Sequence, residues 1–172
     1  MPSTPPTYRE RLRLEGAVLA AAGGLASVLL LALVAEASER AASTAIQIVF
    51  VAVVLAVAGP IFVRRWLGEA QPVTTSGGQL TGQPTALWKP PLVVVVLTAL
   101  FVAPGELGIG AVGWDAGLRI TLGCLLVGLA QALLIERVVA ADEARNGRSY
   151  VRLPGSRATS GTKLGFFPNE RA

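Results

Sequence analysis

The chain has 172 residues and a net charge of +4 at pH 7; 52% of its residues are hydrophobic, 15% are charged, and the mean hydropathy is +0.58. Soluble domains carry about 25% charged residues and divide their apolar residues among short periodic segments. In this chain the apolar residues form long uncharged blocks, which indicates an integral membrane protein. Because the chain has no histidine, the composition also excludes a Ser/His or Cys/His nucleophilic pair and a His-ligated haem. With only one cysteine in addition, it argues against a transition-metal site of the usual ligands, and we expect no cofactor.

The first apolar block, residues 16–35, is predicted to be a membrane span. Its 20 residues would extend about 30 Å as a helix, which is one hydrocarbon thickness. Residues 1–15 precede it as a cytoplasmic N-terminal segment, whose arginines either fix the orientation of the span or touch anionic lipid. A signal-peptidase pattern, Ala35-Glu36-Ala37, follows the block. Signal peptides have apolar regions of only about 7 to 15 residues, so we expect the block to be retained.

The second predicted span, residues 43–63, is rich in valine and isoleucine. Membrane helices tolerate these residues because lipid offers the backbone no partner other than its own carbonyls. The Gly59-Pro60 pair should kink or loosen the last turn. Residues 64–90 are predicted to form a flexible cytoplasmic loop, because Gly, Gln, Thr, Ser and Pro are frequent in it and no periodicity is visible.

The third predicted span, residues 91–112, is interrupted by the sequence Pro104-Gly105-Glu106. The apolar run before the interruption would be about 18 Å long, which is too short to cross a bilayer. We favour a single span kinked at Pro104, and the alternative is a short helix followed by a re-entrant loop over 104–113. Glu106 would then lie in the outer leaflet at a depth comparable to that of Arg119, so we expect the two side chains within salt-bridge or one-water reach.

The fourth predicted span, residues 117–137, carries its small and weakly polar residues on one face. These residues are spaced by 4, 3, 4 and 3 positions: Gly117, Thr121, Cys124, Gly128 and Gln131. A similar stripe in the first span is made of Gly16, Ala20, Gly24 and Ser27. Because small residues let helix backbones approach, we expect the first and fourth spans to pack closely near Gly24 and Gly128.

The C-terminal tail, residues 141–172, is predicted to be cytoplasmic, basic and mostly disordered, because Gly147 and the Pro154-Gly155 pair end regular structure. The predicted fold class is an all-α integral membrane protein. It consists of a bundle of four transmembrane helices within residues 16–140, a flexible cytoplasmic loop and a disordered tail.

Arginine and lysine are distributed unevenly among the connections of this bundle. Residues 1–15, 64–90 and 137–172 contain 13 of the 15, and the other two connections contain only Arg40 and Arg119. Cytoplasmic loops are enriched in these residues, so both termini are predicted to be cytoplasmic. The basic residues flank the apolar blocks, which argues against a nucleic-acid partner. The excess of arginine over lysine, with abundant Ala, Val, Leu and Gly, suggests a GC-rich bacterial genome and therefore the bacterial inner (cytoplasmic) membrane.

Two functions from different classes are compatible with the sequence. We expect a non-enzymatic accessory or scaffold subunit that packs with itself or with a larger membrane complex, because the stripes of small residues are suited to helix contact. The alternative is a small ion- or proton-coupled transporter or channel component centred on Glu106 and Gln131, since acidic residues inside membranes are rare and costly. Glu136, the other carboxylate that could take part in acid–base chemistry, is expected at the inner boundary, too far from Glu106 to share one site.

Overall fold

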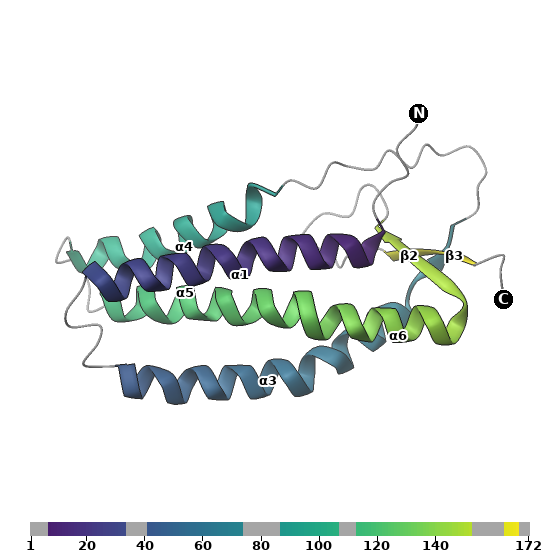
Figure 1. The fold of residues 1–172 in the computed structure, drawn as a ribbon, viewed down its shortest axis with the longest axis horizontal. Helices are drawn as coiled ribbons and strands as arrows, with labels where there is room; N and C mark the ends of the chain where they lie inside the picture. The colour runs from purple at the N-terminus through teal and green to yellow at the C-terminus, as the bar shows by residue number, and fades with distance from the viewer. Residues whose placement is uncertain (1–6, 34–40, 74–86, 107–112, 153–163, 169–172) are drawn as a thin grey trace.

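The computed structural model describes residues 7–33, 41–73, 87–106, 113–152 and 164–168, and it shows long helices side by side with a small sheet at one end (Figure 1). In chain order the helices are α1 (Tyr8–Leu33), α3 (Ala41–Gly68), α4 (Lys89–Glu106), α5 (Trp114–Leu129), the π-helical turn η1 (Ala130–Ile135) and α6 (Glu136–Asn146). The strands are β1 (Gln71–Pro72), β2 (Arg148–Arg152) and β3 (Leu164–Pro168). The bundle is helical as predicted, and the sheet is an addition to the predicted all-α fold.

Three helical segments are long and apolar enough to cross a membrane: Tyr8–Ala32, Ile48–Gly68 and Ala116–Asn146. They overlap the first, second and fourth predicted spans, and each extends further towards the sheet than the prediction. Among the described residues a further apolar helix, Lys89–Leu100, is shorter. The helix α4 continues through Pro104 to Glu106, while residues 107–112, on which the choice between a kinked span and a re-entrant loop depends, lie outside the described part.

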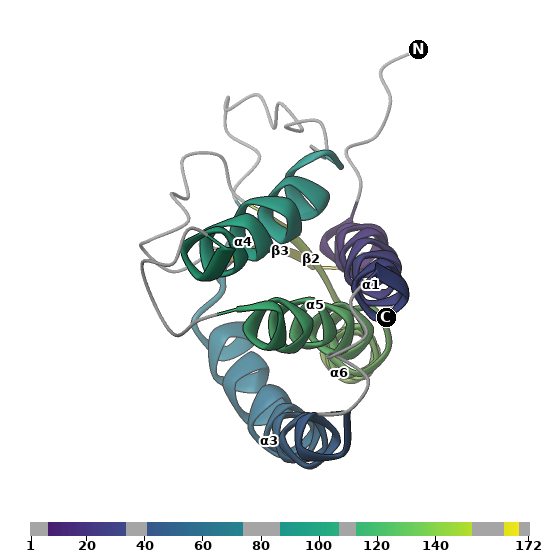
Figure 2. The same cartoon turned by 90° about the vertical axis from the view of Figure 1, so that its left-hand side faces the viewer.

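Helix α5 lies at the centre of the bundle, with α1 and α4 on one side and α3 on the other (Figure 2). Its closest partner is α1, which runs antiparallel to it (Figure 1). A β-carbon added to Gly128 would lie 2.4 Å from the backbone nitrogen of Ala20 and 2.6 Å from the carbonyl oxygen of Gly16. A β-carbon at Gly23 would lie 2.6 Å from the carbonyl oxygen of Thr121. The two backbones can approach this closely only because these positions have no side chain.

Of the two adjacent glycines of α1, Gly23 lies in this close contact and Gly24 does not. The nearest neighbour of a β-carbon at Gly24 is the flexible Cδ1 of Leu125, at 3.6 Å. The small-residue face of α1 therefore consists of Gly16, Ala20, Gly23 and Ser27, at spacings of 4, 3 and 4. These spacings repeat those of Gly117, Thr121, Cys124 and Gly128 on α5, so two faces with the same period lie against each other.

Helix α3 contacts the rest of the bundle mainly at the end near the sheet (Figure 1). Only 6% of its most apolar window is buried within the protein, compared with 28% for α1. Val49, Phe50, Val57 and Ile61 are all more than half exposed. The helix continues through Pro60 to Gly68, so the predicted disturbance at Gly59-Pro60 does not end it. A helix with this exposure is suited to a surrounding of lipid or of another membrane protein.

The three strands form one sheet in the order β1-β3-β2. Strands β2 and β3 are antiparallel, with Tyr150 opposite Phe166, while β1 runs parallel to β3 and is joined to it by the N–H of Val73, which donates to the carbonyl of Phe166 at 3.0 Å. Gly147 makes the turn from α6 into β2. Its φ of 58° and ψ of 41° are left-handed, a conformation that glycine adopts without strain at a helix C-terminus.

The sheet closes a hydrophobic cluster at this end of the bundle, which we call the cap core. It consists of Leu12, Val63, Leu67, Val139, Tyr150 and Leu164. These residues come from α1, α3, α6 and two strands, so segments far apart in the sequence are buried together. The prediction of a mostly disordered tail is therefore wrong for β2 and β3, and the predicted flexible loop begins with the end of α3 and with β1. Burial of Tyr150 and Leu164 beneath the helices provides the apolar contact that orders these strands.

Candidate functional site

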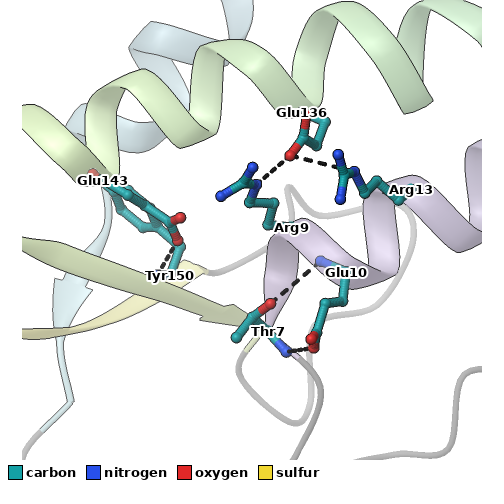
Figure 3. Close-up of polar contacts among 7 residues, drawn as sticks. All are labelled: Thr7, Arg9, Glu10, Arg13, Glu136, Glu143 and Tyr150. Carbon is teal, nitrogen blue, oxygen red and sulfur yellow. Dashed lines mark hydrogen bonds and ion pairs between the residues drawn. The ribbon is translucent and has the colours of Figure 1, made fainter.

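Polar side chains gather at the junction between the bundle and the cap core, and the first of them are placed by the start of α1. Thr7 and Glu10 form a capping box: the N–H of Thr7 donates to Glu10 Oε2 at 2.9 Å, and the N–H of Glu10 donates to Thr7 Oγ1 at 3.3 Å (Figure 3). The box fixes the first turn of the helix. Arg9 and Arg13, four residues apart, then lie on one face of α1 and point towards α6.

The π-helical turn η1 places Glu136 opposite these arginines. The N–H of Glu136 bonds to the carbonyl of Gln131, five residues earlier, where an α-helix would use the residue four positions back. Each residue of an α-helix turns by about 100°, so in a continuous α-helix Glu136, eight residues after Gly128, would be turned about 80° away from Gly128 and from the face that packs on α1. The π-helical turn takes up one residue more than an α-helical turn, which rotates Glu136 back by about 100°, onto that face.

Arg9, Arg13 and Glu136 form an ion cluster (Figure 3). The Nε–H of Arg9 donates to Glu136 Oε1, and Arg13 Nε lies 3.4 Å from the same oxygen. The Glu136 side chain is 5% exposed, whereas those of Arg9 and Arg13 are 41% and 62% exposed. A buried carboxylate is therefore covered by two cations that still reach water, an arrangement that compensates its desolvation.

Tyr150 connects strand β2 to helix α6 beside this cluster. Its hydroxyl donates to Asp142 Oδ2 at 2.6 Å, and its N–H donates to Glu143 Oε1 at 3.0 Å. Burial of the ring, together with the hydrogen bond to the Asp142 carboxylate, raises the pKa of Tyr150 to about 12. The tyrosine is thus held as a neutral donor at physiological pH, which is the role of a structural contact.

A second polar contact lies in the middle of the α1–α5 interface, where Ser27 and Thr121 are both buried. The Ser27 hydroxyl is 2.8 Å from the carbonyl of Gly23 and 2.9 Å from Thr121 Oγ1, and the Thr121 hydroxyl donates to the carbonyl of Leu118 at 3.0 Å. The Thr121 proton goes to its own helix, so its oxygen is available to accept the proton of Ser27. The contact joins the two helices without leaving either hydroxyl unsatisfied.

The predicted packing residues Gly16, Ala20, Ser27, Thr121 and Gly128 all lie in the α1–α5 interface. The half-buried Cys124 also lies there, because its backbone carbonyl carbon would be 3.1 Å from a β-carbon at Gly23.

The predicted functional polar residues are placed differently. Gln131 is half-buried and supplies the carbonyl of the π-helical turn. Arg119 is exposed on α5. Glu106 ends α4, and its side chain lies outside the described part of the chain, as does its predicted contact with Arg119.

The ion cluster was not predicted from the sequence, although its members carried two signals. Arg9 and Arg13 are spaced by four residues, so they share one helical face, and Glu136 directly follows an apolar block. These signals do not show that the carboxylate is buried, because its orientation depends on the π-helical turn. Among the described residues, no group of three or more His, Cys, Asp or Glu side chains is arranged to hold a metal ion.

Comparison with known proteins identifies no relative: no protein-family model matches the sequence, and neither a curated protein nor a solved structure is similar to the chain.

Proposed function

We propose that the protein is a non-enzymatic scaffold or accessory subunit of the bacterial inner membrane, built on four transmembrane helices with both termini in the cytoplasm. Its spans and orientation are supported by the strand pairing and by the distribution of charge. The scaffold role is supported mainly by the exposure of α3.

Strand pairing supports the number of spans. Strands β1 and β2 belong to one sheet, so Pro72 and Arg148 lie on the same side of the membrane. The segment Ala116–Asn146 would cross once between them. The chain must then cross a second time between Val73 and Gly113, and α4 is the apolar helix available there. The same reasoning applies to α1 and α3, because Leu12 and Leu67 share the cap core.

Charge supports the side on which the sheet lies. The described parts of the three arginine-rich and lysine-rich connections lie at the sheet end of the bundle (Figure 1): the start of α1, the end of α3 with β1, and α6 with β2 and β3. Cytoplasmic segments are enriched in these residues, so we place the sheet and both termini in the cytoplasm.

The polar groups at the junction support a structural role. Glu136 is bonded by two arginines, Tyr150 by two carboxylates, and Ser27 by Thr121. Each of these side chains has its partner within the chain, and buried polar groups that satisfy one another stabilise a fold. A catalytic set would need a nucleophile or base directed towards a substrate.

Exposure of α3 supports contact with another protein. Its apolar window is 6% buried, and a β-carbon at Gly59 would have no neighbour within 4 Å. In membranes, small residues mark the places where helices approach closely, so Gly59, Ala52 and Ala56 offer a surface for a partner helix. We propose that α3 packs on a second copy or on another subunit.

Photocrosslinking in native membranes tests this role. A photoreactive phenylalanine analogue in place of Val49, which is 61% exposed on α3 and shares a helical face with Ala52 and Ala56, should give a protein adduct of discrete mass, and twice the protomer mass would identify a second copy. The same analogue in place of Leu25, which is 65% exposed on α1, serves as the control for general exposure and should give lipid adducts. Lipid adducts alone at Val49 and Ala56 would contradict the scaffold role.

A further inference from the structure

A pocket of about 210 Å³ lies between the end of α3 and the η1–α6 segment. Its charged lining consists of Arg64, Arg137, Arg145 and one carboxylate, Asp142, while Leu134 and Val138 contribute an apolar wall. The residues of the ion cluster do not line it. The pocket therefore combines three guanidinium groups with apolar side chains at the end of the bundle that carries the sheet.

The three arginines of the pocket have no partner within the described part of the chain. Every other arginine side chain described there has one: Arg9 and Arg13 bond to Glu136, Arg65 lies 3.6 Å from Glu69, Arg148 stacks on Phe166, and Arg11 and Arg119 also have contacts. The Asp142 carboxylate in the pocket already accepts the hydroxyl of Tyr150 at 2.6 Å. The arginines that have no partner among the described residues thus line one cavity, which leaves it an excess of positive charge.

The location of the pocket indicates the source of an anion. Arg64 follows the apolar part of α3, and the nearby Trp66 is 51% exposed, as is typical of side chains at the level of lipid headgroups. Exposed apolar residues of the same helix, Ile61 and Phe62, continue from this level towards the membrane centre. A phospholipid could therefore place its phosphate among the arginines and its acyl chains along α3.

We propose that this pocket binds the phosphodiester headgroup of an anionic phospholipid. Guanidinium groups bind phosphate oxygens through paired, charge-assisted hydrogen bonds, and basic pockets at the cytoplasmic ends of membrane helices are suited to anionic headgroups. The proposal relies on the membrane placement of the bundle but not on a scaffold role, so its test can fail while the packing of α3 on a partner stands.

Lipid binding to the full-length protein tests the proposal. The protein is purified in a neutral detergent and delipidated, and phosphatidylglycerol or phosphatidylcholine is then added in mixed micelles. Native mass spectrometry should show one retained phosphatidylglycerol, and thermal unfolding should shift upwards with this lipid but not with phosphatidylcholine. Arg64→Gln should weaken the apparent affinity for phosphatidylglycerol about tenfold, which corresponds to about 1.4 kcal/mol.

Arg65→Gln is the matched control, because it removes the same charge one position along α3, outside the pocket. It should leave the affinity unchanged. Equal losses in the two variants, or equal binding of the two lipids, would overturn the proposal in favour of non-specific attraction. Binding of inorganic phosphate as tight as that of the lipid would overturn it in favour of a free anion. If Arg64→Gln does not fold, Arg145→Gln on the last turn of α6 replaces it, with the same expected tenfold loss.

Discussion

The Glu136 carboxylate is almost completely buried, and two partly exposed arginines cover it. The two sides of the ion cluster differ in their access to water, with 5% of the Glu136 side chain exposed compared with 41% and 62% for Arg9 and Arg13. Removal of the carboxylate leaves two guanidinium groups that can turn to water. Removal of both guanidinium groups leaves a buried carboxylate without a cation, so the two deletions should have unequal costs.

The ion cluster therefore predicts an asymmetric effect on stability. Glu136→Gln should lower the free energy of unfolding by about 1–2 kcal/mol, and the double variant Arg9→Gln and Arg13→Gln should lower it by more. Thermal unfolding in detergent measures both, with Glu69→Gln as the control. Its pair with Arg65 is exposed on both sides, so its contribution should be below about 1 kcal/mol. A larger loss for Glu136→Gln than for the double variant would show that the carboxylate is not the buried member.

Tyr150 predicts a pH dependence at the alkaline end. Its pKa in the folded protein is about 12, above the ordinary value of 10.0, so the folded state binds the phenolic proton more tightly than the unfolded state. The contribution of Tyr150 to stability should be complete below pH 10 and should disappear as the pH rises towards 12. Unfolding of the wild type and of Tyr150→Phe measures this contribution as a difference. A difference that stays constant through this range would contradict a raised pKa.

At the scale of elements, the α1–α5 interface depends on particular glycines. Gly23→Ala and Gly128→Ala would place a β-carbon within 2.6 Å of backbone atoms of the facing helix. These backbone atoms can move away only if the whole helix shifts. Each should lower stability by about 1–3 kcal/mol, as overpacking does. Gly24→Ala and Gly123→Ala are matched controls, because the first meets only the end of a flexible leucine and the second meets nothing within 4 Å. Equal melting temperatures for Gly23→Ala and Gly24→Ala would show that the close approach is absent.

The π-helical turn is a second device at this scale, since it rotates α6 relative to α5. Deletion of Leu133, which is 57% exposed within the turn, should restore a continuous α-helix in which Glu136 and Val139 still face α1, because the wide turn takes up one residue. Insertion of one alanine after Leu133 should instead rotate Glu136 and Val139 by about 100° away from α1. The α1–α5 interface would remain in both variants, but the cap core would open only after the insertion. Limited proteolysis should then cleave the tail of the insertion variant and leave the deletion variant intact. Equal resistance of the two variants would contradict the role of the turn.

The sequence predicted those parts of the molecule whose physical cause is local. Long uncharged blocks identify spans because lipid forces backbone groups to pair within a helix. The small residues of α1 and α5 predicted the contact between these helices. The prediction named Gly24, whereas the contact uses Gly23, because the third and the fourth residues after Ala20 both lie close to the face of Ala20.

The sheet and the ion cluster could not be predicted in this way. β1 pairs with β3 across most of the chain, with Gln71 opposite Gly165, and the orientation of Glu136 depends on one inserted residue. Both features are fixed by partners that are distant in the sequence, so no local pattern reveals them.

For the whole molecule, the central claim is that the sheet joins three segments on one side of a membrane that the chain crosses four times. Labelling of single cysteines with a membrane-impermeant maleimide tests it in the full-length protein. In a Cys124→Ser background, Ser38→Cys should react in intact spheroplasts, whereas Thr75→Cys and Ser160→Cys should react only after permeabilisation. Reaction of Thr75→Cys and Ser160→Cys from opposite sides of the membrane would contradict the sheet and, with it, the four-span topology.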